Sequence, residues 1–254
     1  MSHLAIALIV FVCVFGSALL GLFLRDVLPS HHLSDESIGV IKLATGLIAT
    51  MAALVLGLLV SSAKVSFDAE SGDLVRNAAT IISLDRVLAN YGPETQEIRA
   101  SIKTSYADSI KILASGDIKQ LAKLGSPEAV RQTENFQRKI QELTPHNAAQ
   151  GRLQAHALQI VDEVFAQRWL ALLQAQGSIP MSLLVILVAW LSVIFGTFGL
   201  FAPRNATIIA AFVVCALSTA GAIFLIEELS TPLYGIARVS LAPMRNALAH
   251  LGEP

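Results

Sequence analysis

The sequence predicts an all-α integral membrane protein with four transmembrane helices and a helical insert between the second and the third helix. Apolar residues make up 54% of the 254 residues and charged residues only 15%, against about 25% charged residues in soluble domains. The apolar residues also gather in two blocks near the ends of the chain, with a charged block between them. The terminal blocks lack the polar face that a soluble helix keeps, which indicates a membrane environment.

Four apolar segments are long enough to cross a bilayer, which takes about 20 helical residues. They cover residues 4–24, 43–63, 181–202 and 206–226, and none contains Lys, Arg, Asp or Glu. Backbone groups in lipid must be satisfied within the segment, so each one is expected to be a helix, with Asn205 as the N-cap of the fourth. The first segment is too long, and too poor in preceding Lys or Arg, for a cleaved signal peptide.

These spans divide the chain into four expected parts. The parts are a transmembrane hairpin at 1–63, a helical domain at 64–177, a second transmembrane hairpin at 178–227 and an amphipathic tail at 228–254. The central domain and the tail hold 15 of the 18 Lys and Arg residues, whereas the short connections hold only Arg25, Lys42 and Arg204. The positive-inside rule therefore places the central domain, the tail and the N-terminus in the cytoplasm.

The central domain is expected to be entirely helical. Its clearest apolar series at helical spacing is Ile98, Ile102, Tyr106 and Ile110. Ser126 and Pro127 match an N-cap followed by the first helical residue. The stretch at 64–90 is positioned to continue the second span as one helix, and Gly92-Pro93 ends it.

No pattern of catalytic or metal-binding residues is found. Cys13 and Cys215 fall inside apolar runs, and His146 and His156 do not share a helix face with carboxylates. We therefore expect no enzyme activity, no cofactor and no metal ion. The chain also lacks the basic tract that nucleic-acid binding requires.

The second span carries the most informative residue pattern. One helix face begins with a cation and continues with small, weakly polar and apolar residues: Lys42, Thr45, Ala49, Ala52 and Leu56. In an oligomer this face is a candidate pore lining whose outer mouth attracts anions; alternatively, Lys42 extends to the membrane surface and the face only packs. Gly46, Ala53 and Gly57 form a second set, which favours close helix packing.

The segment after the fourth span is the other candidate site. It begins with Glu227 and Glu228 and continues to Pro232 and Gly235. Further along the tail, an apolar face is formed by Leu241, Met244, Leu248 and Leu251. This face fits either the membrane surface or the helices of the central domain.

Several motifs resemble those of the bacterial bestrophin-like domain family, over nearly the whole chain. They are LDR at 84–86, YGPE at 91–94, FGLFAPRNAT at 198–207, CALS at 215–218, and Glu228-Leu229 followed by Pro232 and Gly235. The family is named for its similarity to bestrophins, which are pentameric anion channels whose second membrane helix lines a narrow hydrophobic neck. The resemblance implies that Glu227, Glu228 and the segment from Pro232 through Tyr234 to Gly235 correspond to their acidic and Pro-aromatic-Gly segment. The second span has no Phe and the acidic run is reduced to two glutamates, so aromatic neck rings and calcium gating are not implied.

The resemblance implies a homo-oligomeric channel of the bacterial inner membrane, with five subunits as the family's number. The second helix would line the pore, and chloride or another small anion would be the permeant ion. Besides its own copies and the lipid bilayer, no partner is predicted under this reading. The alternative is a non-conducting membrane scaffold whose cytoplasmic helices bind a partner protein.

Overall fold

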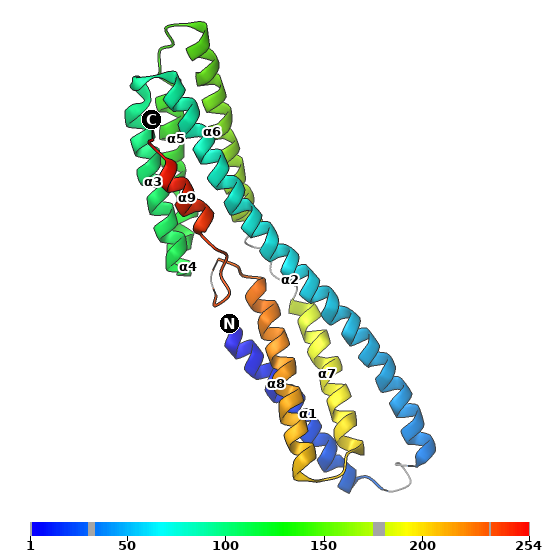
Figure 1. The fold of residues 1–254 in the computed structure, drawn as a ribbon. Helices are drawn as coiled ribbons and strands as arrows, with labels where there is room; N and C mark the ends of the chain where they lie inside the picture. Colours follow the sequence, from blue (N-terminus) through cyan, green and yellow to red (C-terminus); the bar gives the residue numbers. More distant parts are fainter. Residues whose placement is uncertain (1, 30–33, 175–180, 234, 254) are drawn as a thin grey trace. The chain divides into compact units, whose positions relative to one another are not determined.

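The described secondary structure is helical. The computed structural model describes residues 2–29, 34–174, 181–233 and 235–253, and these ranges contain helices and turns but no strand (Figure 1). The α-helices are α1 (His3–Val27), α2 (Asp35–Tyr91), α3 (Gln96–Ser115), α4 (Ile118–Leu121), α5 (Pro127–Gln141), α6 (Ala148–Gln174), α7 (Met181–Phe201), α8 (Ala206–Leu229) and α9 (Ala242–His250). Two 3-10 turns, Pro93–Thr95 and Ala122–Gly125, precede α3 and α5. The all-α class is therefore confirmed.

Four helices, α1, α2, α7 and α8, are long and apolar enough to cross a membrane, and each contains one predicted span. Asn205 caps α8 as predicted, because its side chain accepts a hydrogen bond from the Ile208 N–H at 2.8 Å. Ser126 likewise accepts a hydrogen bond from the Ala129 N–H, with Pro127 as the first residue of α5. The continuation of the second span is also confirmed: α2 runs without a break for 57 residues and ends before Gly92, whose φ of +143° leaves the helical region.

The chain forms two compact units. The first, called the membrane unit, contains Met1–Ser66 and Ser178–Ser230, and the second, called the insert unit, contains Phe67–Gly177 and Thr231–Pro254. Helix α2 contributes its first part to the membrane unit and its last part to the insert unit. The expected boundary between residues 177 and 178 lies outside the described residues, as does Tyr234.

Within the membrane unit, α1 packs closely against α7. A Cβ atom at Gly21 would collide with the carbonyl oxygen of Gly196, and one at Gly199 would collide with that of Ala18. Ala18 itself is fully buried. The two backbones therefore meet with no side chain between them, which only glycine at these positions allows.

One end of this helix pair is held by an arginine of the α7–α8 connection. Arg204 donates a hydrogen bond to the carbonyl oxygen of Leu22 at 2.7 Å and forms an ion pair with Asp26. In return, Arg25 of α1 donates to the carbonyl oxygen of Ala202, just after α7. The Ala202 carbonyl, which lies beyond the end of α7, thus gains a partner that the helix does not provide.

The insert unit has its own apolar core, which also contains the end of the chain. Residues of α2, α3, α5, α6 and α9 form this core. From the tail, Met244, Ala247 and Leu251 are almost completely buried in it. The apolar face of the tail, for which the sequence left two environments open, therefore packs on the helices of the insert unit.

A buried aspartate links the tail to two helices of this unit. Asp85 of α2 is 1% exposed, and its two carboxylate oxygens accept hydrogen bonds from Arg99 of α3 at 2.8 and 2.9 Å. The backbone N–H of Gly252 donates to the same carboxylate at 3.2 Å. Arg99 and Lys103 donate in turn to the carbonyl oxygens of Glu253 and Leu251. Burial alone would raise the pKa of Asp85, but the hydrogen bonds from Arg99 and Gly252 and the nearby arginine charges lower that pKa overall.

We predict that Gly21→Ala destabilises the membrane unit, because the added methyl group forces α1 and α7 apart. Overpacking of this kind costs about 1–3 kcal/mol. Gly16→Ala is the matched control, since a Cβ atom there meets no atom within 4 Å. Thermal unfolding in detergent should show a lower Tm for Gly21→Ala and an unchanged or slightly higher one for Gly16→Ala, since alanine favours a helix more than glycine does. Equal Tm values would contradict the close packing of α1 on α7.

We predict that Asp85→Asn releases the tail, because it leaves the Arg99 guanidinium and its hydrogen bonds without a carboxylate. Breaking a buried ion pair by removing one partner costs about 3–5 kcal/mol, and we expect the lower end because the Arg99 side chain is 14% exposed. The measurement is the rate of trypsin cleavage at Arg245, which should increase. Asp108→Asn, which affects an exposed ion pair with Lys111, is the control and should leave the rate unchanged.

The same pair gives a pH dependence with a defined sign. The folded-state pKa of Asp85 is lowered, so its stabilising contribution is fully present above the unfolded-state pKa of about 3.9. The contribution is lost as the pH falls through the lowered folded-state value. Acid should therefore speed tail cleavage by an acid-tolerant protease in the wild type, with a smaller effect in Asp85→Asn.

Candidate functional site

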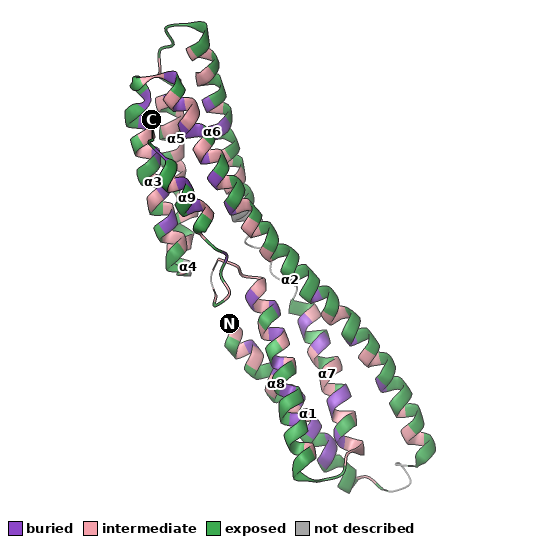
Figure 2. Cartoon of the chain, viewed as in Figure 1, coloured by how far each residue is buried: buried purple, intermediate pink, exposed green. Residues whose placement is uncertain are grey.

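The candidate site is the part of α2 that lies in the membrane unit. Asp35 and Glu36 occupy its first turn, where carboxylates favour the positive end of the helix dipole. Ser34 precedes them and accepts a hydrogen bond from the Ser37 N–H. The charge-free stretch begins after Lys42. In the most apolar 18 residues of α2, only 17% of the residues are buried within the chain, against 33% in the corresponding part of α1 (Figure 2).

One face of this stretch packs against the chain itself. Thr45 and Ala52 are only 7% and 3% exposed, and Ala49 and Leu56 are half-buried. Ala52 belongs to the same apolar core as residues of α1, α7 and α8, and the Thr45 hydroxyl donates to that of Thr197 on α7 at 3.4 Å. These residues are four of the five pore-lining candidates from the sequence, and in the single chain they face neighbouring helices.

The fifth pore-lining candidate, Lys42, is exposed. The three residues expected to serve helix packing, Gly46, Ala53 and Gly57, are exposed as well, and no atom lies within 4 Å of a Cβ built on either glycine. They are therefore not used for packing within the chain. Close helix packing at these positions requires another molecule, so their role stays a prediction for the assembled protein.

The face of α2 opposite the packed residues is covered by large apolar side chains. Leu43, Leu47 and Leu54 are 79%, 65% and 71% exposed. At 100° per residue they lie about 160–200° around the helix from Thr45. These leucines were not predicted from the sequence, because a leucine in an apolar span gives the same sequence pattern whether it faces lipid, protein or a pore.

The acidic pair after the fourth span lies at the end of α8, and its two members differ. Glu228 is 3% exposed, and its carboxylate lies 3.0 Å from the Nδ1 atom of His3 at the start of α1. Glu227 is half-buried. His3 was not among the residues predicted from the sequence, although the four-span topology offered a signal, since it places the start of α1 and the end of α8 on the same membrane side.

The other two residues of the post-span segment accept hydrogen bonds within the insert unit. The carbonyl oxygen of Pro232 accepts a hydrogen bond from the Val239 N–H at 3.0 Å. The carbonyl oxygen of Gly235 accepts one from the Nε atom of Arg238 at 2.8 Å. Among the described residues, no three His, Cys, Asp or Glu side chains are grouped closely enough to hold a metal ion. The expectation that the chain needs no cofactor stays a prediction.

The comparisons with known proteins agree with this architecture. The model of the bestrophin-like domain matches residues 12–244. Among solved structures, three single-substitution variants of a bacterial bestrophin homolog from Klebsiella pneumoniae share the fold. One has a TM-score of 0.61 at 16% identity and covers 97% of this chain and 99% of its own. The other two have TM-scores of 0.62 at 16% and 17% identity, covering 94% of this chain and 99% of theirs.

The comparison with curated proteins gives no significant match. The similarity to the solved structures is low in sequence and therefore concerns the fold. The family match, in contrast, extends from α1 to α9. Together with four helices able to span a bilayer, it shows that this chain is a membrane protein and belongs to the bestrophin-like domain family.

Proposed function

We propose that the chain forms a homo-oligomeric membrane channel that conducts small anions, with α2 lining the pore. The single observation that carries the proposal is the exposed face of α2, which has large leucines on one side and small residues beside them. The membership in the bestrophin-like family supports a channel assembly. A bacterial inner membrane, five subunits and a cytoplasmic insert unit complete the proposal, the last because most Lys and Arg residues lie in that unit.

The ring geometry of such an assembly suggests a role for each face of α2. In a ring with α2 nearest the axis, the remaining helices of each subunit lie further out, so the face of α2 packed on α7 points away from the axis. The opposite face then points toward the pore, and it carries Leu43, Leu47 and Leu54. The small residues Gly46, Ala53 and Gly57 lie between these two faces, where the α2 helix of a neighbouring subunit would pack closely.

This arrangement revises the pore lining expected from the sequence. Thr45, Ala49, Ala52 and Leu56 would support α2 from behind, because they face the chain's own helices. The leucines would form a narrow apolar constriction, of the kind that controls conduction by excluding water. Lys42 lies about 60° around the helix from Thr45, on the side of the small residues, so it would sit beside the contact between subunits at the outer mouth, where its positive charge would raise the local concentration of anions.

We predict that Lys42→Glu shifts ion selectivity toward cations in liposomes containing the purified protein. A unit charge about 4 Å from an ion in water is worth about 1 kcal/mol, so reversal should change the anion-to-cation permeability ratio at least about fivefold at low salt. Lys111→Glu, at a 77% exposed side chain on α3, is the matched control. An unchanged ratio in Lys42→Glu would remove Lys42 from the conduction path.

We predict that Leu54→Ser increases anion flux severalfold, because a hydroxyl group at an apolar constriction holds water there. Leu217→Ser on α8 is the matched control, since Leu217 is also strongly exposed, at 63%, but lies on another helix. Equal flux in the two variants would place Leu54 outside the pore.

The scaffold alternative gives a different set of results. Liposomes with the wild-type protein would then show no anion flux above empty liposomes at any pH or calcium concentration. A stoichiometric partner would instead be recovered through residues 64–177. An oligomeric structure without a central opening along α2 would favour this alternative as well.

A further inference from the structure

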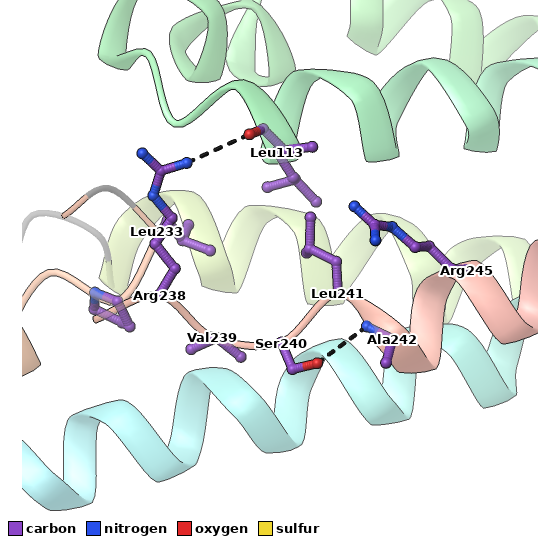
Figure 3. Close-up of a pocket in the computed structure, with 10 residues that line it drawn as sticks. Leu113, Leu233, Arg238, Val239, Ser240, Leu241, Ala242 and Arg245 are labelled. Atoms are coloured by element: carbon purple, nitrogen blue, oxygen red, sulfur yellow. Dashed lines mark hydrogen bonds between the residues drawn. The ribbon is translucent and has the colours of Figure 1, made fainter. Parts of the chain in front are cut away.

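A pocket of about 260 Å³ lies in the insert unit, between the end of α3 and the segment that leads into α9 (Figure 3). Leu113 and Ala114 line it from α3, and the other side is lined by Pro232, Leu233, residues 238–242 and Arg245. The volume is below the range of roughly 300–1,000 Å³ typical of drug-sized ligands. The pocket therefore fits a small group, such as a single headgroup.

Apolar side chains form part of the pocket lining, beside polar groups. Leu113, Leu233 and Leu241 contribute large side chains, and Val239 is almost completely buried beside them. These apolar side chains therefore favour contact with carbon atoms of a ligand over contact with water.

Two arginines supply the charge of the pocket. Arg238 and Arg245 are the charged residues among those lining it, and the lining contains no Asp or Glu. Figure 3 shows both guanidinium groups extending from the segment toward the end of α3. A site with two positive charges and several leucine side chains matches an anion attached to a short apolar chain, and guanidinium groups bind phosphate oxygens in pairs.

The two arginines are held differently. Arg238 donates to the carbonyl oxygens of Gly235 at 2.8 Å and Ala114 at 3.4 Å. It lies against Gly116, which has a φ of +61° and where a Cβ atom would collide with the guanidinium. Arg238 is therefore fixed as a cap on the end of α3. The side chain of Arg245 is exposed, and among the described residues it has no hydrogen-bond or ion-pair partner, so it is the arginine available to a ligand.

The pocket lies close in sequence to the end of α8, a helix able to span the membrane. Pro232 is three residues beyond Leu229, the last residue of α8, so at most about 11 Å of extended chain separates the two. We propose that this pocket binds a phosphate group carried on a short apolar chain, with Arg245 as the main anion contact. A phospholipid headgroup and a soluble phosphate share this chemistry, and the experiment distinguishes them.

The test measures binding to the full-length protein in detergent by microscale thermophoresis. The probes are dioctanoyl phosphatidic acid, dioctanoyl phosphatidylcholine and inorganic phosphate. Phosphatidic acid should bind to the wild type, and Arg245→Gln should weaken this binding about tenfold, as expected for the loss of a charge-assisted hydrogen bond. Arg245→Lys, which keeps the charge, should retain part of the affinity.

Arg152→Gln is the matched control, because Arg152 is an exposed arginine of α6 that does not line the pocket, and it should change the affinity less than twofold. Much tighter binding of phosphatidic acid than of inorganic phosphate identifies a lipid ligand, and equally tight binding of both that depends on Arg245 identifies a soluble phosphate. Equal affinity in the wild type and in Arg245→Gln, with unchanged Tm values, would overturn the proposal, as would equal binding of phosphatidylcholine. None of these measurements uses ion flux, so their outcome does not depend on whether the protein conducts ions.

Discussion

Helices α1 and α7 meet backbone to backbone at Gly21 and Gly199, and the membrane unit is organised around this contact. A larger residue at either glycine would place a Cβ atom on a carbonyl oxygen of the other helix. In lipid there is little hydrophobic drive to hold helices together, so this close packing has to supply much of the attraction. Polar contacts then hold α1 at both ends, through Arg204 and Asp26 at one end and through His3 and Glu228 at the other.

The close packing of α1 with its neighbours leaves α2 as the least covered span. Helix α1 contacts both α7 and α8, whereas α2 presents only the face around Thr45 and Ala52 to the common core. The remaining faces of α2 carry leucines and small residues that the chain itself does not cover. In a membrane such a helix is suited to contact other subunits, and this is the physical reason for proposing an assembly around α2.

The insert unit depends on a different kind of contact. Its apolar core is closed by the C-terminal helix α9, and the chain end is fixed by the carboxylate of Asp85, which is hydrogen-bonded to Arg99 and to the backbone of Gly252. The same tail supplies Arg238 and Arg245 to the pocket at the end of α3. Docking of the tail is thus a condition for the proposed phosphate site, because without it the pocket has only one wall.

The amino-acid sequence by itself determined the four spans, their helical state, the caps at Ser126 and Asn205 and the unbroken continuation of α2. These features depend on residue type and local spacing, which are visible along the chain. The family resemblance, which is confirmed, also rested on short motifs. Only the tertiary structure decided which face of α2 is covered, because a helical repeat defines faces but does not say which one meets a neighbour. It also brought together pairs distant in sequence, such as His3 with Glu228 and Asp85 with Gly252, since side-chain contacts between distant segments follow from packing and not from local pattern.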